Sequence, residues 1–143
     1  MGLVKQILDT KGKEIFTITP GTSVYHALEL MVEKNVSALL VMENDKLAGI
    51  FTERDYARKV ALKGKSSKDT VIGDIMTREL ITVSPESTID ECMALMTGKY
   101  IRHLPVVSKE NLMGIISIGD VVRRIIEDQK LIIGHMEQYI AGS

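Results

Sequence analysis

The chain is poor in cysteine and in aromatic side chains. Its 143 residues include one cysteine, Cys92, no tryptophan and only 4% aromatic residues. A single cysteine excludes an internal disulfide and favours a reducing compartment. Because aromatic rings are scarce, the core has to be built from aliphatic side chains and from the eight methionines.

Neither sign of charge is in excess, and no long apolar run occurs. Lys+Arg is 18 and Asp+Glu is 19, which gives a net charge of −1. This balance argues against a protein whose whole surface binds nucleic acid. A bilayer span needs about 18 consecutive apolar residues, and the sequence has no such run. We therefore expect no membrane association and a cytoplasmic location.

The chain repeats itself at an offset of 65 residues, and its hydrophobic content of 45% is that of a globular protein. Residues 17–20 (TITP) fall on 82–85 (TVSP), and 49–55 (GIFTERD) fall on 114–120 (GIISIGD). Two copies of one small structural unit are therefore expected.

Both copies predict the order β-α-β-β-α. Apolar residues at helical spacing predict a helix from Val24 and another from Ile89, and Thr88 with Glu91 fits a capping box for the second. Short links predict hairpins, and a last helix is expected to start near Asp55 and Asp120. The predicted strands are 15–19, 37–42, 47–52, 80–84, 104–107 and 112–117, and a tail helix is predicted from 125 to 140.

A copy of roughly 60 residues is near the lower limit for an independent core. The predicted fold is therefore α/β (α+β), with two β-α-β-β-α repeats packed sheet to sheet about a pseudo-two-fold axis, which would create two equivalent clefts. The expected boundaries are 4–62 for the first domain, 63–70 for a polar linker, 71–127 for the second domain and 128–143 for a helical tail.

The repeated strand-to-helix junction is the first candidate site. Each copy has a hydroxyl three residues before a carboxylate: Thr52 before Asp55, and Ser117 before Asp120. A carboxylate there can accept hydrogen bonds from a ribose diol, and helix N–H groups suit phosphate. The alternative interpretation is structural, because Thr, Ser and Asp are all good helix N-caps.

Two further features admit other functions. Arg102 and His103 offer donors for phosphate, or belong to an ordinary solvated surface, and a minor nucleotide-processing enzyme centred on His103 is an alternative. The basic stretch 54–68 could bind a nucleic-acid backbone, although no aromatic residues interleave with it. The three histidines have no metal-ligand spacing, so no metal is expected, and Cys92 lies on an apolar helix stripe typical of a core.

The repeated Thr-x-x-Pro segments, the Leu-Pro-Val-Val strand at 104–107 and the two Gly-Ile-x-(Ser/Thr)-x-x-Asp segments resemble a tandem pair of cystathionine-β-synthase (CBS) domains, of the small stand-alone type. The resemblance implies a non-catalytic regulatory or energy-sensing module that binds an adenosine-containing ligand. AMP or NAD is the first expectation, with ATP, ADP or S-adenosylmethionine as alternatives. It also implies a homodimer and an unidentified effector protein.

The resemblance further implies which residues line the clefts, because in this family each cleft takes residues from both domains. One set is Thr52, Arg54, Asp55, Met76, Thr77, Leu80, Ile101, Arg102 and His103. The other set is Ser117, Gly119, Asp120, Ile15, Val36, Ser37 and Ala38. The first set has the cations for phosphate, so the second is expected to prefer less charged ligands. Leu40 departs from the pattern, because the second copy has Pro105 in the corresponding strand.

Overall fold

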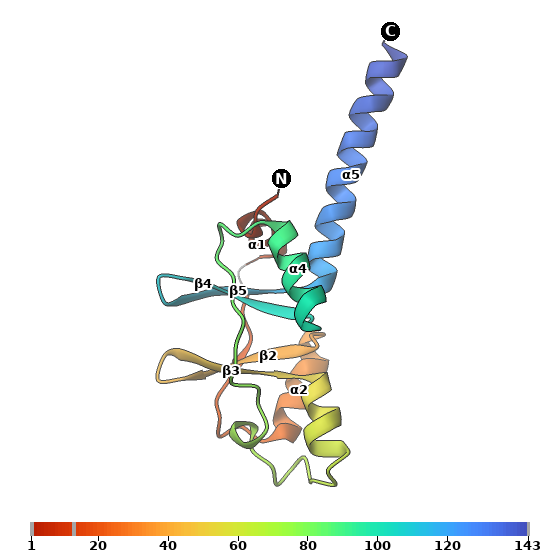
Figure 1. Cartoon of the computed structure of the whole chain (residues 1–143). Helices are drawn as coiled ribbons and strands as arrows, with labels where there is room; N and C mark the ends of the chain where they lie inside the picture. The colour runs from red at the N-terminus through yellow and green to blue at the C-terminus, as the bar shows by residue number, and fades with distance from the viewer. Residues whose placement is uncertain (1, 13, 143) are drawn as a thin grey trace. The chain divides into compact units, whose positions relative to one another are not determined.

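A computed structural model describes residues 2–12 and 14–142 (Figure 1). The chain forms two compact units that do not follow chain order. Unit 1 consists of Met1–Lys13, Thr82–Ser108 and Met113–Ser143, and unit 2 consists of Glu14–Ile81 and Lys109–Leu112. Each unit is therefore built around one of the two repeats, but it also takes in a segment from elsewhere in the chain.

Unit 2 contains a three-stranded sheet in the order β1-β2-β3. Strand β1 (Thr17–Ile18) is parallel to β2 (Ala38–Glu43), which is antiparallel to β3 (Lys46–Thr52). The turn between β2 and β3 consists of Asn44 and Asp45, both at positive φ, as the tightest hairpin turns require. Helix α2 (Val24–Lys34) packs on the sheet through the apolar positions that the sequence predicts, with Val24, Ala27 and Met31 buried.

The chain leaves β3 directly into a helical segment in unit 2. Helix α3 (Glu53–Asp55) continues as the π-helical segment η1 (Tyr56–Ala61), and a short 3-10 helix, η2 (Ile72–Asp74), follows later. Phe51, which is fully buried, and Met76 belong to the same aliphatic core. The core of this unit is therefore mainly aliphatic, as the composition predicts, with Met31 and Met76 as its buried methionines.

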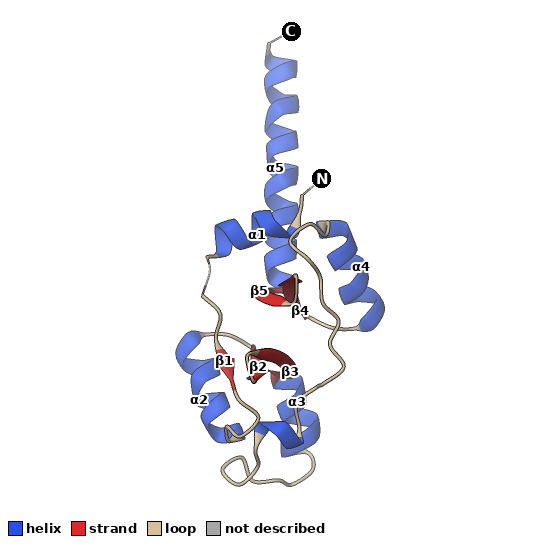
Figure 2. Cartoon of the chain, turned by 90° about the vertical axis from the view of Figure 1, so that its left-hand side faces the viewer, coloured by secondary structure: helices blue, strands red, loops and turns tan. Residues whose placement is uncertain are grey.

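Unit 1 has the same plan with a longer last helix. Strands β4 (His103–Ser108) and β5 (Asn111–Ser117) form a two-stranded sheet, and α4 (Ile89–Lys99) contacts β4 and α5 (Ile118–Ala141). Helix α1 (Val4–Lys11) also packs in this unit, against α5 (Figure 2). The mixed α and β composition and the two-fold repetition are both as the sequence predicts.

The lead-in segment before each repeat packs in the unit of the other repeat. Val4 N donates to Ser87 O at 2.9 Å, and Ile89 N donates to Gly2 O at 3.0 Å. In the same way Ile72 N, which precedes the second repeat, donates to Thr22 O at 2.8 Å in the first. The two lead-ins are thus exchanged, which local sequence patterns do not indicate.

Several predicted element boundaries are corrected by the structure. Strand 15–19 shortens to β1, and the predicted strand 80–84 is reduced to one parallel bridge between Val83 and Val106. The second hairpin turns on Lys109 and Glu110 alone, since Asn111 already belongs to β5. The tail helix predicted from residue 125 is continuous with α5, because nothing in its sequence breaks the helix after Ile118.

Candidate functional site

The two repeated junctions are helix N-termini with reciprocal capping. Thr52 and Ser117 are the N-cap residues, and their hydroxyls accept hydrogen bonds from the backbone N–H groups of Asp55 and Asp120. The carboxylates in turn accept from the backbone N–H of Thr52 and of Ser117. The last helices therefore start at Glu53 and Ile118, earlier than predicted, because the hydroxyl residue and not the aspartate ends the strand.

Asp55 has partners on both carboxylate oxygens within unit 2. Its Oδ2 accepts from Thr52 N at 3.0 Å and from Thr52 Oγ1 at 3.1 Å. Its Oδ1 accepts from Thr77 Oγ1 at 2.9 Å and lies 3.0 Å from Lys59 Nζ. Lys59 Nζ also donates to Ile75 O at 3.1 Å. Thr77 therefore contacts Asp55, and a shared ligand site for the two residues stays a prediction.

Asp120 is the matching carboxylate of unit 1, and it has two cations. Its Oδ2 lies 2.8 Å from Lys11 Nζ, which also donates to Ile115 O at 2.8 Å. Its Oδ1 lies 2.7 Å from Arg123 Nη2. Burial alone would raise the pKa of Asp120, but the hydrogen bonds from Lys11 and Ser117 hold this pKa below its ordinary value of 3.8. The carboxylate is therefore kept ionised.

Burial and three neighbouring charges control His103, at the start of β4. Burial, together with the positive charges of Lys11 and Arg102, lowers the pKa of its imidazole from 6.5 to about 4, against the opposing effect of Asp120. The backbone of this segment also meets the junction, since Ile118 N donates to Arg102 O at 2.9 Å. His103 therefore belongs to the same cationic neighbourhood as Asp120.

Each unit contains part of both expected residue sets. Within unit 2 the junction also meets the start of β2, because Glu53 N donates to Ser37 O at 3.2 Å. Met76 lies in the core of unit 2, with 6% of its surface exposed. Unit 2 holds Ile15, Val36, Ser37, Ala38, Thr52, Arg54, Asp55, Met76, Thr77 and Leu80, and unit 1 holds Ile101, Arg102, His103, Ser117, Gly119 and Asp120. The grouping across the two repeats stays a prediction.

Sequence reasoning missed the cations that bind the two aspartates. Lys59 was placed only in a basic stretch, although its spacing of four residues from Asp55 on a helix indicates an ion pair. Arg123 has a similar signal, three residues after Asp120. For Lys11 no local signal exists, because it comes from α1, more than a hundred residues away along the chain.

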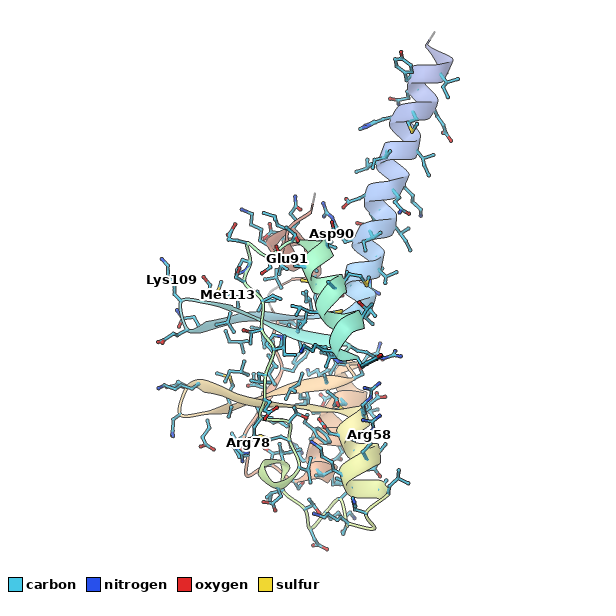
Figure 3. The ribbon with its side chains drawn as sticks, in the orientation of Figure 1. Arg58, Arg78, Asp90, Glu91, Lys109 and Met113 are labelled. Carbon is cyan, nitrogen blue, oxygen red and sulfur yellow. The ribbon has the colours of Figure 1, made fainter. Side chains whose placement is uncertain are left out.

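The other features singled out in the sequence have ordinary structural surroundings. Cys92 is buried in α4, and burial raises the pKa of its thiol to about 11, so its assignment to the core is confirmed. In the basic stretch, Lys68 Nζ lies 4.9 Å from the centre of the Tyr25 ring, and Arg58 lies on η1 at the surface of unit 2 (Figure 3). Among the described residues no three His, Cys, Asp or Glu side chains form a group that could hold a metal.

Comparison with known proteins identifies the repeats. Residues 4–62 and 72–127 both match the CBS-domain family. The chain is 42% identical to the mitochondrial CBS domain-containing protein CBSX3 of Arabidopsis thaliana, over 97% of this chain and 72% of that protein. A solved structure of a putative signal-transduction protein with CBS domains from Burkholderia ambifaria superposes with a TM-score of 0.85 at 51% identity, covering 89% of this chain and 96% of that one.

A third relative carries ligands. The CBS domain pair of protein MJ0100, solved in complex with 5′-methylthioadenosine and S-adenosyl-L-methionine, has a TM-score of 0.78 and 28% identity, and it covers 90% of this chain and 98% of that one. Two matched copies in one chain, with the whole fold shared by these structures, mean that this protein belongs to the CBS-domain family as a tandem CBS pair, which is a regulatory module.

Proposed function

We propose that this protein is a non-catalytic sensor of adenosine-containing ligands, and that Asp55 and Asp120 bind the ribose. One observation carries the proposal: Asp55 and Asp120 are the charged side chains that are buried within residues 2–12 and 14–142, and they occupy equivalent junctions in the two repeats. Helix capping alone does not require a buried carboxylate, because an exposed one caps equally well.

The contacts around each aspartate suit a ribose phosphate. A ribose diol can donate two O–H bonds to one carboxylate. Lys59 is paired with Asp55, and Lys11 is paired with Asp120. When ribose takes the carboxylate, the ammonium group of that lysine would be available to a phosphate oxygen. Because Asp120 is close to Lys11, Arg123 and His103, we infer that the site in unit 1 takes the more anionic ligand. This reverses the preference expected from sequence, which assigned Arg102 and His103 to Asp55.

The ligand class rests on the family and on one relative. AMP or NAD remains our first proposal, with ATP, ADP and S-adenosylmethionine next, since the MJ0100 pair was solved with two adenosine derivatives. We propose that an effector protein responds to ligand occupancy and that the protein acts as a homodimer in the cytoplasm. In the part of the chain that the structure describes, no helix is long and apolar enough to cross a membrane.

Calorimetric titration of the full chain with AMP, ATP, NAD and S-adenosylmethionine tests the proposal. We expect Asp55→Asn and Asp120→Asn each to abolish or weaken one site about tenfold or more, a loss of about 1.4 kcal/mol. Asparagine keeps an oxygen that can accept the N-cap N–H, so the fold should be kept, although the ion pairs with Lys59 or with Lys11 and Arg123 are lost. Asp45→Asn is the matched control, since Asp45 lies in the exposed β2–β3 turn.

Two results would contradict the proposal. One is that none of the four ligands binds more tightly than about 1 mM, which corresponds to only about −4 kcal/mol. The other is that both variants bind as the wild type does but melt earlier, which would leave the aspartates with a capping role alone. A gel shift of nucleic acid that is lost at modest salt and unaffected by either variant would favour the basic stretch instead.

A further inference from the structure

The second half of α5 exposes a row of large apolar side chains. Leu131, Ile132, Ile133, Met136 and Tyr139 are between 55% and 81% exposed, whereas Val121 in the first half is fully buried. In Figure 1 this half of the helix runs beyond the other elements of unit 1. Helices shorter than about 12–15 residues are marginal in water without packing. The exposed segment therefore has the properties of a helix that packs against a partner.

The spacing of three of these residues, together with Ile125 and Gln129, indicates a helical partner. Ile125, Gln129, Ile132, Met136 and Tyr139 follow one another at intervals of four, three, four and three residues, which is the seam of a coiled coil. The opposite face carries Glu127 and Gln138. A helix that lies on a lipid surface is instead rich in Lys and Arg on its polar face. The pattern therefore favours a second helix over a membrane.

A groove in unit 1 continues this seam toward the start of α5. It is lined by Ile89 and Asp90 of α4 and by Gln6 of α1, and on α5 by residues from Arg124 to His135, including Asp128 and Ile132. Figure 3 shows Asp90 in the first turn of α4. The groove thus combines apolar side chains with Asp90 and with the ion pair between Arg124 Nε and Asp128 Oδ1, which are 3.3 Å apart, and such a lining suits an aromatic ring with a polar end.

We propose that α5 pairs antiparallel with α5 of a second copy of this chain, centred on Ile132. In this register Tyr139 of one copy lies opposite Ile125 of the other, so its ring enters the groove and its hydroxyl faces Asp128 or Asp90. His135 lies opposite Gln129, so its ring N–H can donate to the side-chain amide oxygen of that residue. The two-fold rotation that relates the two copies fills both of their equivalent grooves in the same way.

A parallel pair fits less well. It would place Tyr139 against Tyr139 and leave both grooves without an occupant. The groove therefore favours the antiparallel arrangement. This interface goes beyond the proposed ligand function, because none of its residues belongs to the two junction sites.

Sedimentation analysis of the full chain over a concentration series tests the pairing. We expect Ile132→Glu combined with Met136→Glu to halve the mass of the wild-type oligomer. The matched control is Gly134→Glu with Gln138→Glu, which adds the same charge at the same spacing on the opposite face, where a side chain at Gly134 meets no atom within 4 Å. The control should keep the wild-type mass, and all three proteins should give the same ligand titrations.

Disulfide trapping tests whether the two α5 helices pair antiparallel. Under oxidising conditions we expect Ile132→Cys to form a covalent dimer and Met136→Cys to remain monomeric on a denaturing gel, since only residue 132 meets its own copy. Cys92 does not interfere, because it is buried. Equal trapping of both variants would overturn the antiparallel pair. A mass that is the same for the wild type and the 132/136 variant would overturn pairing through α5, as would recruitment of the wild type as a monomer to phosphatidylserine vesicles.

Discussion

At the scale of single residues, the neutral imidazole of His103 links this protein's stability to pH. Burial and the nearby Lys11 and Arg102 lower its pKa to about 4, whereas an unfolded chain has a histidine pKa of 6.5. As the pH falls below 6.5 the unfolded chain binds a proton that the folded chain does not. Stability from this residue is therefore full above pH 6.5 and is lost as the pH falls toward 4.

We expect urea unfolding, followed by circular dichroism between pH 7 and pH 4, to show a loss of about 2 to 3 kcal/mol from this residue. His103→Gln should flatten the pH dependence between pH 6.5 and 4, whatever its effect on stability at pH 7. His26→Gln is the control, since His26 is exposed on α2. An unchanged slope in the His103 variant would mean that carboxylates alone cause the acid sensitivity.

At the scale of elements, the equivalent strands β3 and β5 are covered by different segments. A Cβ built on Gly49 of β3 would lie 2.8 Å from Thr77 O, which is backbone. A Cβ on Gly114, the equivalent residue of β5, would lie 2.8 Å from Leu8 Cδ2, the far end of a flexible side chain. Both repeats thus have a glycine where a lead-in segment crosses the strand. An added methyl group should be tolerated better at Gly114 than at Gly49.

Gly49→Ala should therefore destabilise the protein by about 1 to 3 kcal/mol, as overpacking against a rigid group does. Gly114→Ala should cost clearly less, because Leu8 can change its rotamer. Thermal unfolding of the two variants under one buffer provides the comparison, and each serves as the other's control. Equal losses would show that the backbone around Thr77 moves as easily as the Leu8 side chain.

At the scale of the whole molecule, the exchanged lead-ins make each repeat depend on a segment that is distant in the sequence. Val4 and Ile7 of α1 are buried in unit 1, and Lys11 brings an ammonium to Asp120. Residues 71–77 serve unit 2 in the corresponding way, through the Ile50–Thr77 bridge and the Ile72–Thr22 hydrogen bond. A destabilising substitution in the lead-in of the first repeat should therefore destabilise the second repeat, and the reverse should hold for the other lead-in.

Ile7→Ala tests this dependence. Truncation of a buried isoleucine costs about 2 to 5 kcal/mol, and we expect the loss to appear as faster amide exchange in β4, β5 and α4. Strands β2 and β3, which follow α1 in the chain, should keep their protection. Val32→Ala is the control, because Val32 is 82% exposed on α2. Faster exchange in β2 and β3 instead would show that α1 supports the repeat that it precedes.

Local patterns predict much of this structure because their causes are local. The stripes of α2 and α4, both hairpins and the burial of Cys92 follow from periodicity and turn chemistry. Strand 80–84 could not be predicted correctly, because a strand forms only where a neighbour pairs with it, and only Val83 pairs, with Val106. For Asp55 the sequence predicts both a cap and a ligand site, and the structure shows the cap.

The sequence by itself determined that this protein is a tandem repeat with an aliphatic core and two equivalent hydroxyl–carboxylate junctions, since repetition and periodicity are written in the chain. Only the tertiary structure decided which distant residues meet those junctions. Lys11 reaches Asp120 and Thr77 reaches Asp55 because the lead-ins are exchanged, and the exchange depends on packing between segments far apart in the sequence. The same packing stops partway along α5, so its second half is left exposed.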